Sequence, residues 1–235
     1  MGAFLFGQLP DKGELSCTYS IGTNWLFPDN NGTGTKLIRF EQNSTIEYGD
    51  SIHTKEQSLC ELTNKELHIR LGSNSILEVK DGELLITKGN ILINNKSGRE
   101  LSITSELSTL NTEGQFTGII DCTSNGGFKF IPLEGKGKII PEHGKTKDIY
   151  RGRLTMIIGS PSQLGSAYDI DLLLLLKSSR LINSFPTALP SMKRISLSVY
   201  AQQLRMKGKY NALIGDAPTN DNLQMWAFGE DDAKK

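Results

Sequence analysis

The sequence predicts an all-β protein, an antiparallel roll or sandwich of many short strands with a small two-helix C-terminal extension. Three observations predict this fold class. Residues 75–120 consist of short apolar runs that Gly, Asn and Asp interrupt at close intervals. Apolar and polar residues alternate at several other places. Glycines recur mostly at about the 8–12-residue spacing that is typical of turns in sandwiches and barrels.

Residues 75–120 contain the clearest strand pattern. Two near-copies, residues 82–87 and 89–94, are each too short for a helix, rich in branched side chains and opened by a glycine that can turn the chain. Farther along, Leu101 and Ile103 alternate with serine and threonine, which is the period of a strand with one buried face. The region therefore predicts a meander of strands around an aliphatic core.

A second alternating stretch covers residues 67–71, where three apolar residues alternate with His68 and Arg70. Glu61 lies between two apolar neighbours in the same way, one predicted strand earlier. Parallel strands that are buried on both sides read as continuous apolar runs, so alternation favours antiparallel strands with one solvated face. On this basis we expect His68 to lie on the surface.

The chain divides by composition into four parts. The parts are an irregular N-terminal segment (1–35), a β domain (36–160), a helical extension (161–210) and a polar tail (211–235). In the N-terminal segment we expect only short strands, near residues 4–6 and 15–21.

Two helices are predicted in the extension. The first covers residues 172–182, where Asp169 or Asp171 can accept the free backbone N–H groups at its start. Its run of five leucines needs to be covered, either by the chain's own roll or by another chain. We expect residues 160–166, which are mostly small, to form a linker to the roll.

The second helix is expected to follow Pro186 and Pro190, with Ser191 as its N-cap. It would end at Gly208. Four apolar residues share one face of this helix by their spacing: Met192, Ile195, Val199 and Met206.

Composition excludes several classes of function. The formal net charge is zero, with 26 basic and 26 acidic residues, so no broad attraction to nucleic acid or anionic lipid is expected. The longest purely apolar run, Leu172–Leu176, is far shorter than the ~20 residues that cross a bilayer. We therefore predict no nucleic-acid partner and no transmembrane span. Residues 1–9 also lack the basic region and the apolar length of a signal peptide.

No residue pattern predicts a catalytic, cofactor-binding or metal site. Gly144-Lys145-Thr146 looks like the end of a phosphate-binding loop, but that pattern requires a glycine where Ile139 stands. His53, His68 and His143 lack ligand spacing, and the motifs HExxH and GxSxG do not occur. We expect a protein that is not an enzyme and that uses no cofactor.

The three cysteines are far apart in sequence and have no metal-like spacing. Cys17, Cys60 and Cys122 are each expected to be a small buried apolar residue. Their odd number allows at most one disulfide bond.

Residues 47–140 follow an ordered pattern of glycine, aliphatic and polar positions. It opens with Gly49-Asp50 and Thr54, and residues 66–71 with Ser75 and Val79 form its next step. The repeated segments at 83–93 and the alternation at 101–104 continue it. In these positions the stretch resembles the FecR-like domain family, and the likeness becomes degenerate at Gln115, where the family has Thr. The resemblance covers about two-fifths of the chain.

The resemblance implies a β domain of a bacterial cell-envelope protein, periplasmic or exported, that relays a signal by binding other proteins. We therefore predict a non-enzymatic envelope module that binds a partner protein or ligand in signal relay or scaffolding. One alternative is a structural component of an envelope or surface assembly. Another is a carbohydrate-binding β protein, for which Trp25 and Trp226 would be the candidate aromatic residues.

Overall fold

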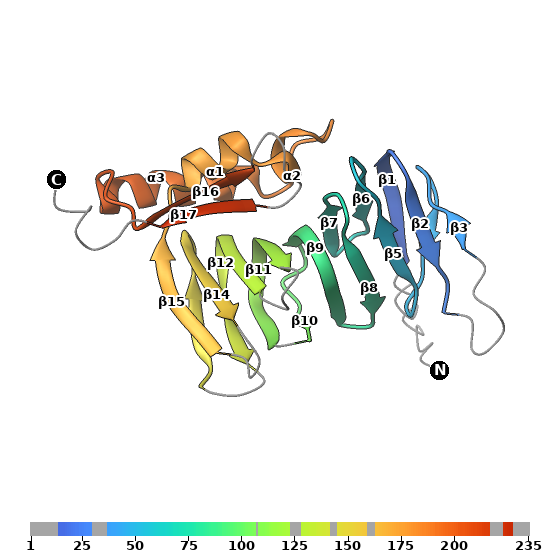
Figure 1. Cartoon of the computed structure of the whole chain (residues 1–235), viewed down its shortest axis with the longest axis horizontal. Helices are drawn as coiled ribbons and strands as arrows, with labels where there is room; N and C mark the ends of the chain where they lie inside the picture. Colours follow the sequence, from blue (N-terminus) through green and yellow to red (C-terminus); the bar gives the residue numbers. More distant parts are fainter. Residues whose placement is uncertain are drawn as a thin grey trace, which may run out of the picture.

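In the part of the chain that the structure describes, fifteen strands form one sheet that is folded into two layers, and three helices with a β-hairpin cover one side of it (Figure 1). The computed structural model describes residues 14–29, 37–106, 108–122, 128–141, 145–158, 163–216 and 223–227. We call strands β1 to β15 the roll, and the helices with the hairpin β16–β17 the helical unit. The predicted all-β fold class with a small helical C-terminal extension is confirmed.

The first strands of the roll are short. They are β1 (Leu15–Ile21), β2 (Asn24–Phe27), β3 (Ile38–Arg39), β4 (Thr45–Ile46), β5 (Ser51–Thr54), β6 (Leu59–Thr63), β7 (Leu67–Leu71) and β8 (Ile76–Lys80). The later strands include three long ones beside further short ones. They are β9 (Glu83–Asn95), β10 (Leu101–Ser105), β11 (Ser108–Cys122), β12 (Phe128–Pro141), β13 (Lys147–Tyr150), β14 (Arg153–Ile158) and β15 (Gln163–Asp169).

The long strands β9, β11 and β12 each belong to both layers because they change partners part way along. The first half of β9 pairs with β8 and, in parallel, with β10, whereas its second half pairs with β7 and β11. Each strand changes partners near a glycine with positive φ: Gly89 (85°), Gly114 (68°) and Gly135 (84°). Glycine adopts this conformation without the steric cost of a Cβ, so these residues allow the strands to bend between layers.

The two layers enclose the main hydrophobic core. Residues 59–63, 67–71, 89–95, 116–122 and 128–134, with β14, form the layer next to the helices, which we call the helix-side layer. The other layer contains β2, β5, β8, β10 and β13 with the remaining halves of the long strands. Aliphatic and phenylalanine side chains from both layers form one buried cluster between them. All three cysteines are buried, as predicted, and none of them forms a disulfide bond in the structure; Cys17 Sγ lies 3.8 Å from Cys60 Sγ.

A second hydrophobic core lies between the helix-side layer and the helical unit. Leu92, Ile119 and Ile131 point outward from the sheet into this core, where they meet buried leucines of the helices. The outer face of the helix-side layer is therefore buried, which corrects the prediction of a solvated face. Glu61 is 3% exposed, His68 5% and Arg70 0%. His68 was expected on the surface, and it is buried because the helical unit covers this face.

The helical unit begins at Asp171, which caps α1 (Leu172–Ser178) by accepting from the backbone N–H groups of Leu173 and Leu174. The expected single helix over 172–182 is interrupted, because Ser179 has extended backbone angles and separates α1 from α2 (Arg180–Asn183). Helix α3 (Met192–Met206) follows Ser191 as predicted. It ends at Lys207, which is in the left-handed conformation, just before Gly208.

The ends of the described chain also form strands. β1 confirms the strand expected near residues 15–21, and the one expected near 4–6 lies outside the described residues. Residues 163–166, expected to be part of a linker, instead begin the edge strand β15, which pairs with β14. Within the segment predicted to be a polar tail, β16 (Ala212–Asp216) pairs with β17 (Leu223–Ala227).

Candidate protein-interaction site

A buried cluster of charged residues joins the helix-side layer to the helical unit. Arg70 Nε donates to Glu61 Oε2 at 2.8 Å, and His68 Nε2 lies 2.8 Å from the same oxygen. The hydroxyl of Thr18 donates to Glu61 Oε1 at 2.8 Å, and that of Thr187, in the loop before α3, donates to the carboxylate at 3.1 Å. Both oxygens of this buried carboxylate therefore have hydrogen-bond donors.

Arg70 makes its remaining contacts with the segment that follows α1. Its guanidinium donates to the backbone carbonyls of Leu181 (3.1 Å) and Ile182 (3.2 Å) and to that of Thr187. The ring of Phe185 lies beside it, with 4.5 Å from Cζ to the ring centroid. These carbonyls belong to α2 and to the loop after it. The hydrogen-bond pattern of the helix leaves them without a donor. Arg70 therefore fixes this segment to the roll.

The chemistry of this cluster is structural. Burial would raise the pKa of Glu61, but hydrogen bonds from His68, Thr18 and Arg70 outweigh it and lower that pKa from 4.5 to about 2. A carboxylate with such a low pKa stays ionised at neutral pH and is a poor general acid or base. Its function here is to compensate the buried guanidinium.

The other residues considered as candidates do not come together. The ring of His53 lies against that of Phe27, 3.9 Å between centroids, and burial, followed by the charge of Lys55, lowers the pKa of His53. His143 and Gly144 lie outside the described residues. Trp25 is half-buried on β2, and nothing is described of the side chain of Trp226. Among the described residues, no group of three or more His, Cys, Asp or Glu side chains is placed to hold a metal ion.

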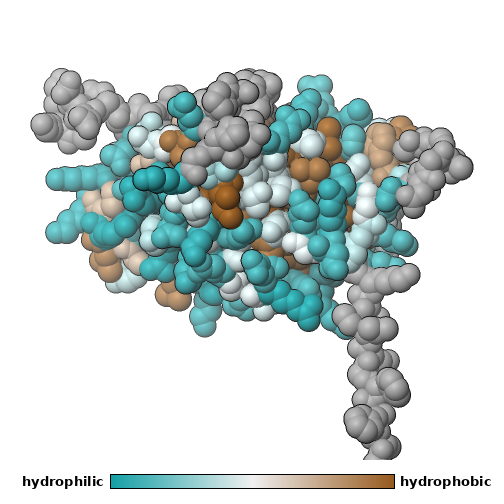
Figure 2. Space-filling view, turned by 90° about the horizontal axis from the view of Figure 1, so that it is seen from below, coloured by the Kyte–Doolittle hydropathy of each residue, from teal (hydrophilic) through white to brown (hydrophobic). Residues whose placement is uncertain are grey.

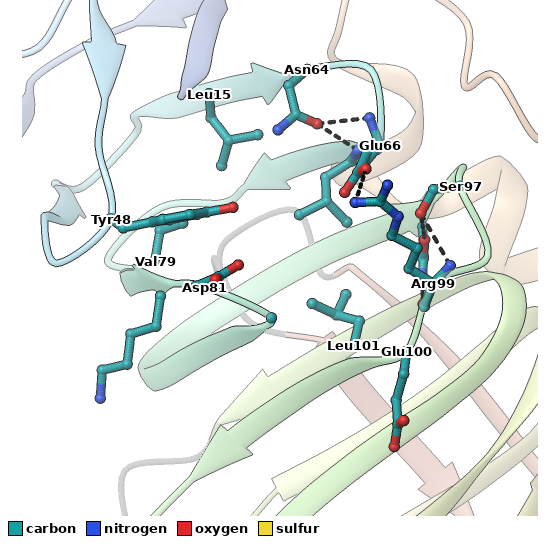
Figure 3. Close-up of a pocket in the computed structure, with 14 residues that line it drawn as sticks. Leu15, Tyr48, Asn64, Glu66, Val79, Asp81, Ser97, Arg99, Glu100 and Leu101 are labelled. Atoms are coloured by element: carbon teal, nitrogen blue, oxygen red, sulfur yellow. Dashed lines mark hydrogen bonds and ion pairs between the residues drawn. The ribbon is translucent and has the colours of Figure 1, made fainter. Parts of the chain in front are cut away.

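A pocket of about 210 Å³ opens at one end of the roll, where turns from both layers meet (Figure 3). The ring of Tyr48 forms one wall, and the ion pair between Arg99 and Glu66 (2.6 Å) forms the opposite wall. Leu15 and Leu101 lie between these two walls. The pocket is lined by apolar, acidic and basic groups.

The outward face of α3 carries the most exposed large apolar side chains of the described chain. Leu197 and Tyr200 are each 62% exposed, and Leu204 is 60% exposed. Their spacing of three and four residues places them on one face of the helix. By contrast, the side of the molecule seen in Figure 2, turned from the view of Figure 1 to look from below, is largely hydrophilic with scattered apolar residues.

The spacing of Met192, Ile195, Val199 and Met206 predicted the inward stripe of α3, and the exposed stripe was not predicted. The signal was present, because residues 197, 200 and 204 have the same helical spacing as Ile195 and Val199, shifted around the helix axis. The burial of Glu61 and Arg70 also had a signal. Adjacent apolar residues such as Ile91-Leu92-Ile93 and Ile119-Ile120 indicate strands that are covered on both faces.

No helix among the described residues is long and apolar enough to cross a membrane. No protein-family model matches the chain, and no curated protein matches its sequence.

Among solved structures, the chain is similar to two crystal structures of a proposed anti-sigma factor from Parabacteroides distasonis, determined at 1.65 and 2.50 Å resolution. The TM-scores are 0.44 and 0.43, the sequence identity is 8% in both cases, and each match covers 76% of this chain and 99% of the other. A similarity at this level does not establish a family for this chain, so the resemblance to FecR-like domains stays a hypothesis.

Proposed function

We propose that this chain is a non-enzymatic module of a bacterial cell envelope that binds a partner protein through its helical unit, in signal relay or scaffolding. The observation that carries the proposal is the outward face of α3. Three large apolar side chains, each at least 60% exposed, lie together on one helix. Such clusters are typical of protein-interaction surfaces, since single scattered apolar residues are common but aligned ones are not.

The way in which the helical unit is held to the roll supports a role in relay or scaffolding. Helix α3 is anchored by Gln202, which donates to the carbonyls of Gly152 (3.2 Å) and Ile170 (2.7 Å) and accepts from the backbone N–H of Leu172. Arg70 holds the α2 segment in the same manner. Buried polar contacts hold the helices to the roll. A partner that binds α3 is therefore attached to the roll as well.

The test is site-specific photocrosslinking in the native host. A photoreactive phenylalanine analogue in place of Tyr200 should give one discrete adduct with a different protein. The same analogue in place of Tyr150, which is 55% exposed on β13, serves as the matched control. The adduct from position 200 should disappear when Leu204 is changed to Ser in the same chain.

Absence of an adduct at position 200, or identical adducts at both positions, would contradict the proposal. An adduct with a second copy of the same chain would favour the alternative, a structural component of an envelope or surface assembly.

A further inference from the structure

The exposed apolar residues of α3 form the centre of a longer stripe. Lys193 lies four residues before Leu197 on the same face of α3, and Lys207, the C-cap residue, follows three residues after Leu204 just beyond the last turn. Both lysines are exposed. From Lys193 to Lys207 the stripe is about 21 Å long at 1.5 Å per residue. It therefore presents an apolar centre with one positive charge at each end.

Movement of α3 itself would not bury the stripe without loss, because the opposite face of the helix already packs on the roll. Ile195 is 0% and Val199 7% exposed, both in the core beneath the helical unit. Gln202 continues that stripe and makes the anchoring hydrogen bonds to the roll. Rotating α3 to cover Leu197 would break these contacts, so the stripe stays exposed on the surface of the described residues.

The charges on α3 distinguish between possible partners. Every charged residue of the helix is basic. Arg194 is bound to Glu134 (3.1 Å) and Arg205 to Asp169 (3.2 Å), so both face acidic groups of their own chain. Lys193 and Lys207 instead lie at the ends of the exposed stripe. A second copy of α3 would place lysine beside lysine in either orientation, which is unfavourable.

We propose that α3 binds an amphipathic helix of a different protein, with apolar residues at heptad spacing and acidic residues about 21 Å apart at its two ends. This inference rests on the proposed function and names the chemistry of the partner. Apolar side chains of the two helices would interdigitate, while the acidic residues would pair with Lys193 and Lys207.

The test measures the binding of two synthetic helical peptides to the full chain, by fluorescence anisotropy at low salt. Both peptides carry three leucines at spacings of four and three, and they differ only in the flanking residues, glutamate in one and lysine in the other. The glutamate peptide should bind roughly tenfold more tightly, as expected from two exposed charge pairs that are attractive in one complex and repulsive in the other.

Charge reversal provides the sharpest control. The variant K193E/K207E should reverse the preference and bind the lysine peptide more tightly. The variant K55E/K65E changes two exposed lysines on the roll by the same charge and should keep the original preference. The variant L197S/Y200S/L204S should lose binding of both peptides while keeping the circular dichroism spectrum, because the side chains it changes are exposed.

Several outcomes would overturn the inference. These are equal binding of both peptides, no binding of either, or a preference that K193E/K207E leaves unchanged. Binding to anionic phospholipid vesicles that the L197S/Y200S/L204S variant loses would assign the face to a lipid surface instead. Dimerisation that the same variant abolishes would assign it to a second copy. If the peptides fail but the crosslink at position 200 forms, only the acidic helix is rejected and the protein-binding function stands.

Discussion

Removal of the Arg70 guanidinium should destabilise the folded protein strongly. In Arg70→Met, the Glu61 carboxylate would remain buried without its cationic partner, and three backbone carbonyls would lose a donor. Breaking a buried ion pair by removing one partner typically costs about 3–5 kcal/mol. Urea unfolding should show a loss of this size.

The matched control is Arg39→Met, because Arg39 pairs with Glu41 where both side chains are more than half exposed. This change should alter the free energy of unfolding by less than about 1 kcal/mol. The double variant E61Q/R70M should recover part of the loss, since no uncompensated charge is then buried. If Arg70→Met were as mild as Arg39→Met, the cluster would not hold the helical unit in place.

The same cluster predicts acid sensitivity. The pKa of Glu61 is about 2 in the folded protein, below its usual 4.5, so the folded state favours the ionised carboxylate. Its contribution to stability is therefore fully present above about pH 4.5 and is lost as the pH falls towards 2. Urea midpoints measured from pH 6 to 2.5 should fall more steeply for the natural chain than for Glu61→Gln. Parallel pH profiles for the two proteins would contradict this assignment.

At the scale of the element, the bends in the long strands depend on glycine to different degrees. A Cβ at Gly135 would lie 2.6 Å from the carbonyl oxygen of Gln115 and 2.9 Å from the Cα of Phe116. At Gly114, which also has positive φ, a Cβ would meet nothing within 4 Å. Gly114→Ala should therefore cost only the backbone strain of about 1–2 kcal/mol, and Gly135→Ala distinctly more. Equal losses in thermal or urea unfolding would show that the bend at Gly135 relaxes.

The elements were largely predictable, because they depend on short-range patterns. Alternation identified β7 and β10, and the leucine run located the start of α1, for which Asp169 and Asp171 were both candidate caps and Asp171 is the cap observed. The break at Ser179 was not predictable from composition. It belongs to a contact between distant parts of the chain, because it places the carbonyls of α2 where Arg70 can donate to them. The burial of His68 was missed for a similar reason. It depends on the helical unit, more than 100 residues later in the chain, covering that face.

The candidate site was less predictable than the fold. Exposed Leu197 and buried Ile195 are both apolar residues on one helix, and spacing alone shows two stripes without showing which one faces the roll. Gln202 decides which stripe faces the roll. It lies on the same face of the helix as Ile195, and its hydrogen bonds to Gly152 and Ile170 hold that face against the roll.

At the scale of the whole molecule, the helical unit is predicted to be a required part of the fold. It covers Leu92, Ile119, Ile131 and the fully buried Arg70. A chain truncated after Asp169 keeps every strand of the roll but exposes this face, so it should aggregate or melt at a lower temperature. In the full chain, hydrogen exchange in α1 and the buried turns of α3 should be as slow as in β9. A truncated chain that is soluble and as stable as the full one would show that the helical unit is an independent appendage.

The two-sided burial of the helix-side layer has a consequence for synthesis. The ribosome completes all strands of the roll before it produces residues 170–216, which takes roughly 2–10 s more at 5–20 residues per second. During that interval Arg70 and the outward leucine and isoleucines have no cover. The nascent chain then has a nearly complete sheet with one exposed apolar face. A general holdase chaperone that shields apolar surface should be needed most at this stage.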